Sequence, residues 1–133
     1  MERPIAIVHY GESTADAPAI ASVLRHDGLS CDVTPVAGRE AFHRRLHEHD
    51  VDLVLAEHAP PTVDGPGAVR LAHEVRPDLP CISLLRAPND PLEAAFFSAG
   101  AIDVVVAQRE ARLSRAVRRA LREASERVAR ARA

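Results

Sequence analysis

The acid Glu57 stands where an α/β protein would place a reactive group. It directly follows the apolar run 53–56, which is typical of a buried strand, and it precedes a proline-rich loop that ends in the turn signal Asp64-Gly65. A carboxylate at the end of a buried strand can accept a transferred group or bind a metal ion. What Glu57 does depends on the groups around it.

Four histidines suggest further chemistry. His9 and His58 could bind a divalent metal such as zinc together with Glu57, or an imidazole could hydrogen-bond or ion-pair with the carboxylate. Adjacent residues at a strand end point to opposite sides, which disfavours joint ligation by Glu57 and His58. His43 and His47 are spaced i and i+4 and could form half a metal site, but the arginines around them favour a solvated basic face. We therefore expect no bound metal.

The charge pattern is uneven, and every basic residue apart from histidine is arginine. The chain has 17 arginines, 19 acids and a formal net charge of −2. Residues 109–133 carry nine Arg and three Glu, whereas the other 108 residues carry eight Arg and 16 acids. The chain therefore contains no lysine. No glycine-rich phosphate loop and no credible nucleophile–base pair is visible, and we expect no cofactor.

The composition indicates one domain. The 133 residues are 47% hydrophobic and only 3% aromatic, which suits an aliphatic α/β core. Cys31 and Cys81 lie in separate apolar runs without metal-binding spacing, so we expect buried free thiols in a reducing cytoplasm. No apolar run approaches the length of a membrane span, and no signal peptide is recognisable, so we expect a soluble cytoplasmic chain.

Apolar runs alternate with segments of helical spacing. The expected strands cover residues 4–9, 31–36, 51–56, 79–85 and 102–107. The expected helices cover residues 13–26, 38–49, 67–75, 91–99 and 111–133. Pro35 predicts that the second strand lies at an edge of the sheet. The alternation predicts a doubly wound, three-layer α/β sandwich with parallel strands, whose site lies at the carboxyl ends of the strands.

The segment DLVLAEHAPPTVDG resembles the third-strand region of receiver domains of two-component response regulators. In that pattern an acid ends the strand, proline follows four residues later, and Asp-Gly follows at seven and eight; here these are Glu57, Pro61, Asp64 and Gly65. RPDLPCISLL and SAGAIDVVV resemble the family's approaches to strands four and five. The resemblance covers residues 5–121 and implies a flavodoxin-like (βα)5 fold with sheet order 2-1-3-4-5.

The resemblance also implies a set of catalytic groups, which this sequence does not carry. In a receiver, two acids after strand one hold Mg²⁺, and an Asp after strand three accepts the phosphoryl group. A Ser or Thr after strand four and a Lys after strand five contact it. The metal and the lysine neutralise charge as the phosphoryl group reaches the carboxylate. The corresponding residues here are His9, Tyr10, Glu57, Leu85 and Ala107.

We therefore expect a pseudo-receiver that cannot be phosphorylated and has no catalytic residue. Its degenerate pocket would comprise the following residues: Glu57, His9, Tyr10, His58, Leu85 and Ala107. The longer side chain of Glu57 either mimics a charged aspartyl phosphate in part or is a neutral remnant, and the missing hydroxyl and lysine favour a remnant. The alternatives are a phosphoacceptor that uses Glu57 and a sensor of a metal or small ligand at the same pocket.

The last predicted helix is unusually long. It contains no Gly or Pro, and its 23 residues would span about 34 Å at about 1.5 Å per residue, more than one side of the sheet requires. Its apolar stripe is predicted to form an interaction helix: Leu113, Val117, Leu121 and Val128. We expect residues 1–121 to form the receiver-like domain and residues 122–133 to continue the helix towards a following domain.

Taken with the resemblance, these features predict an interaction and signal-relay module from a hybrid sensor kinase or another multidomain regulator in a phosphorelay. The expected partner is a histidine kinase, a downstream domain of the same chain, or a second copy that dimerises through the C-terminal helix as a weak coiled coil. Nucleic acid is not expected to bind, because the arginine-rich helix has no aromatic residue and contains interspersed glutamates. A membrane partner is not expected either.

Overall fold

The chain folds into five strands that alternate with five helices. The structure is a computed structural model and describes residues 3–13, 15–48, 50–106 and 110–132. The strands are β1 (Ile5–Tyr10), β2 (Cys31–Val36), β3 (Leu53–Ala56), β4 (Cys81–Leu85) and β5 (Asp103–Val106). The helices are α1 (Asp16–His26), α2 (Arg39–Leu46), α3 (Gly65–Val75), α4 (Asp90–Ala99) and α5 (Glu110–Arg132).

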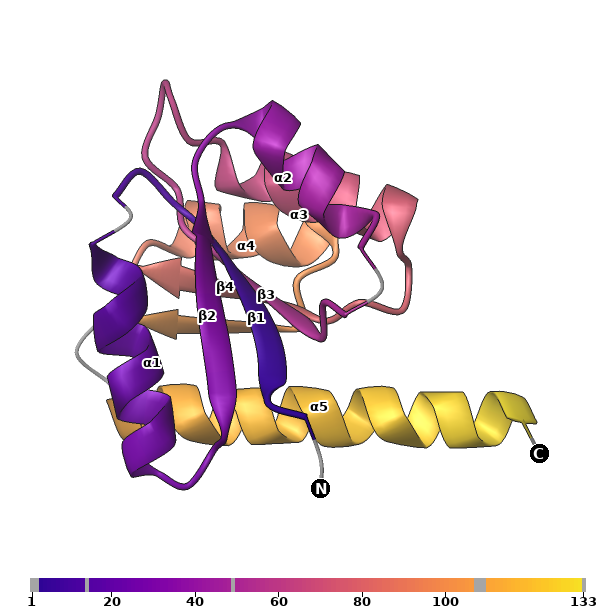
Figure 1. Ribbon diagram of the computed structural model, residues 1–133. Coiled ribbons are helices and arrows are strands. Elements are labelled where there is room, and N and C mark those ends of the chain that lie inside the picture. The colour runs from indigo at the N-terminus through magenta and orange to yellow at the C-terminus, as the bar shows by residue number, and fades with distance from the viewer. Residues whose placement is uncertain (1–2, 14, 49, 107–109, 133) are drawn as a thin grey trace.

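The strands form one parallel sheet in the order β2-β1-β3-β4-β5, which confirms the flavodoxin-like doubly wound fold. Helices α2, α3 and α4 cover one face, and α1 and α5 cover the other (Figure 1). β2 lies at an edge and contains Pro35, as predicted, because an edge strand leaves one row of backbone groups without a neighbour. Each face has its own buried apolar cluster.

Local signals determine where several helices begin and end. The Asp64 side chain accepts a hydrogen bond from the Gly67 N–H at 3.0 Å and caps α3, and Asn89 caps α4 through the Leu92 N–H at 3.1 Å. α4 ends at Ala99, and its C-cap is Gly100, whose φ of 119° is left-handed. α2 ends at Leu46, earlier than the predicted 49, with His47 as its C-cap.

Helix α5 is held to the rest of the domain by its first half. Its buried residues pack against the sheet and end with Ala120, and no residue from 121 to 132 is fully buried. At the end of α1, the Asp27 carboxylate accepts a hydrogen bond from the Ser114 hydroxyl, and the Asp27 carbonyl accepts one from Arg118. The second half of α5 projects past the sheet (Figure 1). Within the described residues, no helix combines the length and apolar character that crossing a bilayer requires.

Candidate functional site

The ends of β1 and β3 bring His9 and Glu57 together. His9 pairs with Leu55 in the parallel register and Tyr10 pairs with Ala56, and the Glu57 N–H donates to the Tyr10 carbonyl at 2.9 Å. Side chains alternate across a strand, so His9 lies on the same face as Ile7, towards α1 and α5. The sheet register therefore places an imidazole and a carboxylate from distant parts of the chain side by side.

The His9 imidazole hydrogen-bonds the Glu57 carboxylate through Nε2. The His9 side chain is fully buried and the Glu57 side chain is 13% exposed. A carboxylate only accepts, so Nε2 is the donor, and the second ring nitrogen, Nδ1, is left without a hydrogen-bond partner among the described residues. Because this pair is largely removed from water, the hydrogen bond matters more to stability than one on the surface would.

Gly11 provides the space that the pair occupies. A Cβ at position 11 would lie 3.0 Å from Glu57 Oε2 and 3.3 Å from His9 Cε1. Any side chain there would therefore press on both members of the pair. Gly11 was not among the residues predicted for the pocket, although its position directly after the first apolar strand was an available signal.

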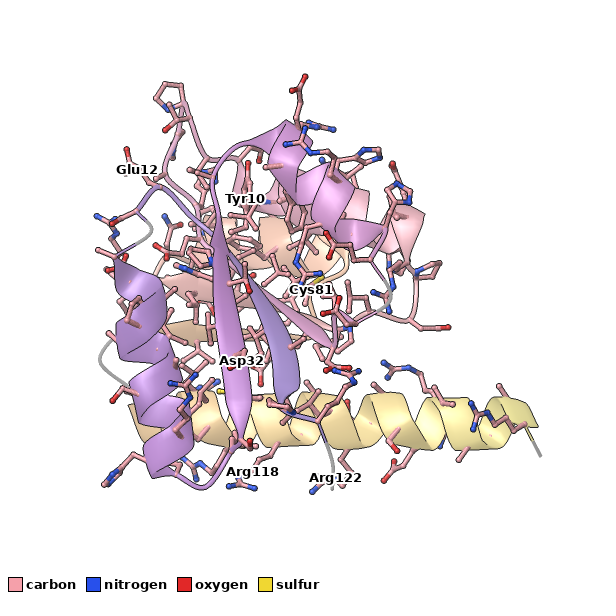
Figure 2. The ribbon with its side chains drawn as sticks, in the orientation of Figure 1. Tyr10, Glu12, Asp32, Cys81, Arg118 and Arg122 are labelled. Carbon is pink, nitrogen blue, oxygen red and sulfur yellow. The ribbon has the colours of Figure 1, made fainter. Side chains whose placement is uncertain are left out.

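Tyr10 lies on the other face of the sheet. Its ring packs against Phe42 of α2 with a centroid separation of 4.8 Å, and it is buried in the cluster under α2–α4. Figure 2 shows Tyr10 close to α2, and Glu12 at the outer edge of the loop after β1. Burial raises the pKa of Tyr10, the Asp64 charge raises it further, and Arg39 opposes the shift. Tyr10 is thus a core residue in this structure.

His58 also points away from Glu57. Its Nδ1 accepts a hydrogen bond from the Gly65 N–H at 3.1 Å, and its ring meets Phe96 of α4 edge-on at 6.4 Å between centroids. Glu57 and His58 therefore lie on opposite sides, as expected for adjacent residues at a strand end. Within the described residues, no group of three or more His, Cys, Asp or Glu side chains is placed to hold a metal ion.

The loop between Glu57 and α3 is closely built around Gly65. Ala59 and Val63 exchange two backbone hydrogen bonds of 2.9 Å, and the Pro60–Pro61 bond is cis. A Cβ on Gly65 would lie 2.4 Å from both the Glu57 carbonyl oxygen and Phe96 Cζ. The Asp-Gly pair of the sequence motif thus has two structural roles: Asp64 caps α3, and Gly65 allows α3 to approach the end of β3.

The carboxyl end of β4 is apolar. Leu85, at the position where the resemblance implies a hydroxyl, is 3% exposed and packs in the cluster under α2–α4. The one hydroxyl of β4 belongs to Ser83, which pairs with Ala56 and Val104 in the sheet, and its Oγ has no partner within the described part of the chain. Ser83 was not among the predicted site residues, although a serine inside the apolar run CISLL was a visible signal. Ala107 lies outside the described residues.

The four residues predicted to form the interaction helix have different environments. Leu113 and Val117 are buried in the domain's own core, Leu121 packs against that core, and Val128 is 44% exposed. Arg118 and Arg122 lie on the edge of α5 away from the sheet (Figure 2). Of the predicted stripe, only its C-terminal part is available to a partner.

The sequence matches no protein-family model, and no curated protein matches it. Solved structures, in contrast, match over nearly the whole chain. The CheY-like response regulator receiver domain protein from Methanospirillum hungatei is 17% identical with a TM-score of 0.80, and the match covers 94% of this chain and 99% of that one. The signal receiver domain of an HD domain-containing protein from Pseudomonas fluorescens is 20% identical with a TM-score of 0.83, covering 98% and 96%.

A third match places the same fold inside a longer chain. NtrX from Brucella abortus is 15% identical with a TM-score of 0.82, and the match covers 97% of this chain but 29% of NtrX. At such identities the likeness is one of fold. The five-stranded α/β architecture of receiver domains is therefore the architecture of this protein.

Proposed function

We propose that this chain is a receiver-like signalling domain that does not accept a phosphoryl group and that works by contacting protein partners. The observation that carries the proposal is the His9–Glu57 hydrogen bond. At the position that the resemblance assigns to the phosphoacceptor, the acid is engaged by an imidazole rather than placed beside a metal-binding carboxylate pair.

The electrostatics of the site support this proposal. Phosphoryl transfer onto a carboxylate brings two anionic groups together, and proteins offset the repulsion with metal ions and fixed cations. The chain has no lysine, and residues 1–108 carry twice as many acids as arginines. Tyr10 is packed in the core and supplies no metal-binding carboxylate, and Leu85 is apolar and supplies no hydroxyl.

The same pair bears on the two interpretations of Glu57. A mimic of the phosphorylated state would act through a free negative charge that neighbouring groups detect. The Glu57 carboxylate instead has a buried local partner, and the residue at the hydroxyl position is leucine. These contacts favour a structural remnant that ties β1 to β3.

The relay function rests on α5. The helix is anchored to the core through Ala120, and no described residue beyond it is fully buried. A movement of the anchored part would therefore move residues 122–132 with it as one rigid body. The partner is proposed to be a histidine kinase, a downstream domain of the same chain or a second copy. The match to one part of NtrX supports a module that works within longer proteins.

Incubation with acetyl phosphate and Mg²⁺ tests the proposal, with intact-mass measurement as the readout. We expect no gain of a phosphoryl group in the wild type, and none in Glu57→Asp, because a shorter acid does not supply the missing cation. Addition of beryllofluoride and Mg²⁺ should leave the amide resonances of Gly11 and Gly65 in place. A phosphoryl adduct on the wild-type protein, or a saturable shift of these resonances, would overturn the proposal.

The partner surface is tested separately by sedimentation of the full chain and of a chain that ends after Leu121. If copies pair through the exposed half of α5, the full chain should sediment as a dimer at high concentration and the shortened chain as a monomer. Identical behaviour of the two chains would contradict pairing through this helix.

A further inference from the structure

The exposed pair His43 and His47 on α2 has the geometry of a metal chelate. Both residues are exposed, and the two Nε2 atoms lie 3.5 Å apart, with the rings nearly perpendicular at 84°. His43 belongs to α2, and His47, its C-cap, retains helical backbone angles (φ −81°, ψ −6°). One helical turn therefore presents two imidazole nitrogens in the same direction.

The separation of the two nitrogens suits coordination better than a mutual hydrogen bond. The two nitrogens lie 3.5 Å apart, which is long for a hydrogen bond; N–H···O bonds, for comparison, usually lie at about 2.7–3.2 Å. Tetrahedral zinc holds its imidazole nitrogens at about 2.0–2.1 Å, so two of its ligands lie about 3.3–3.4 Å apart. Only a small movement of these exposed side chains would bring the two Nε2 atoms to that separation.

The charges around the pair are mixed. Arg45 donates to the carboxylates of Glu48 and Asp50, both at 2.9 Å, which offsets its charge. Arg39, Glu40 and Arg44 line a cavity of about 490 Å³ together with His43 and Leu71 of α3. The two arginines oppose a bound cation and Glu40 favours one. Both imidazoles are exposed, so water molecules can complete the coordination.

We propose that His43 and His47 bind one divalent transition-metal ion through their Nε2 atoms, with zinc and copper as the fitting ions. Imidazole ligands select such ions over Mg²⁺ and Ca²⁺, which prefer oxygen, and the expected order of affinity is Cu²⁺ above Zn²⁺. The sequence alone favoured a solvated basic face here. The proposal does not rest on the proposed signalling function, and α2 covers the face of the sheet opposite to the His9–Glu57 pair.

Calorimetric titration of the untagged full chain with zinc sulfate in a non-chelating buffer tests this site. The expected result is one zinc ion per chain, with the binding isotherm lost in both His43→Gln and His47→Gln. His26→Gln, on the exposed side of α1, and Glu57→Gln are the matched controls and should bind as the wild type does. Magnesium sulfate should give no binding isotherm in any variant.

A second readout locates the ion directly. Zinc should shift the imidazole nitrogen resonances of His43 and His47 in long-range nitrogen–proton spectra and leave those of His9 unchanged. The absence of binding at millimolar zinc, binding that persists in the His43→Gln/His47→Gln double variant, or binding lost in Glu57→Gln or in His26→Gln would overturn the assignment.

Discussion

His9 and Glu57 are 48 residues apart in the chain and share a hydrogen bond at the ends of neighbouring strands. The imidazole is wholly buried and the carboxylate nearly so. The pair joins β1 to β3 beside the Pro-rich loop. It lies at the carboxyl ends of the strands, where proteins of this architecture place their sites. Its contribution to stability can be separated from any contribution to signalling.

Glu57→Ala should lower the free energy of unfolding by about 1–3 kcal/mol, because it leaves the buried Nε2–H of His9 without an acceptor. Glu57→Gln keeps an oxygen acceptor and should cost less. Equilibrium unfolding in urea measures the free energy of unfolding of both variants. In a double-mutant cycle, His9→Leu combined with Glu57→Ala should be less destabilising than the sum of the single changes. Strict additivity would show that the two side chains do not interact in solution.

Gly65→Ala should destabilise the domain much more than Gly11→Ala. The added methyl group at position 65 meets a backbone oxygen and the Phe96 ring, each at 2.4 Å, and overpacking of this kind typically costs about 1–3 kcal/mol. At position 11 it meets the end of the Glu57 side chain, which can move. Thermal unfolding should rank the variants in this order, and Gly11→Ala should change the imidazole resonances of His9. Equal thermal unfolding midpoints for the two variants would contradict the close approach of α3 to the end of β3 at Gly65.

Both cysteines should resist alkylation in the folded protein. Burial raises the pKa of Cys81 to about 12 and also raises the pKa of Cys31. Because the reactive form is the thiolate, a raised pKa means that at pH 8 nearly all of the Cys81 thiol stays protonated, and reactivity can increase only as the pH rises towards that value. Iodoacetamide followed by mass measurement should show no rapid adduct at pH 8 in native buffer and two adducts in urea. Rapid native labelling of Cys81 would contradict its burial.

Two substitutions on α5 should separate its packing role from its exposed role. Leu113→Ala removes a buried side chain and should cost about 2–5 kcal/mol of unfolding free energy. Val128→Ala changes an exposed side chain and should stay within about 0.5 kcal/mol. The comparison is made by urea unfolding at low protein concentration, where copies of the chain do not associate. A large effect of Val128→Ala under those conditions would mean that the end of the helix folds back onto the domain.

The order of the elements, the edge position of β2 and the strand-end position of Glu57 could all be predicted before folding was considered, because they depend on local patterns. Apolar runs of strand length, a proline inside a strand and an Asp-Gly turn act over a few residues. The missing lysine is likewise a property of composition alone. Which side chains meet follows only from the folded arrangement, because the direction of a side chain depends on sheet register and on which helix covers each face.

That dependence explains what the sequence could not show. His9 and Tyr10 are neighbours in the chain, yet strand alternation sends His9 to Glu57 and Tyr10 to Phe42 on the other face. The contact of Ser114 with Asp27 joins residues 87 positions apart, and only the packing of α5 beside α1 creates it. The 3.5 Å separation of the His43 and His47 nitrogens depends on side-chain conformations that the i, i+4 spacing permits but does not specify.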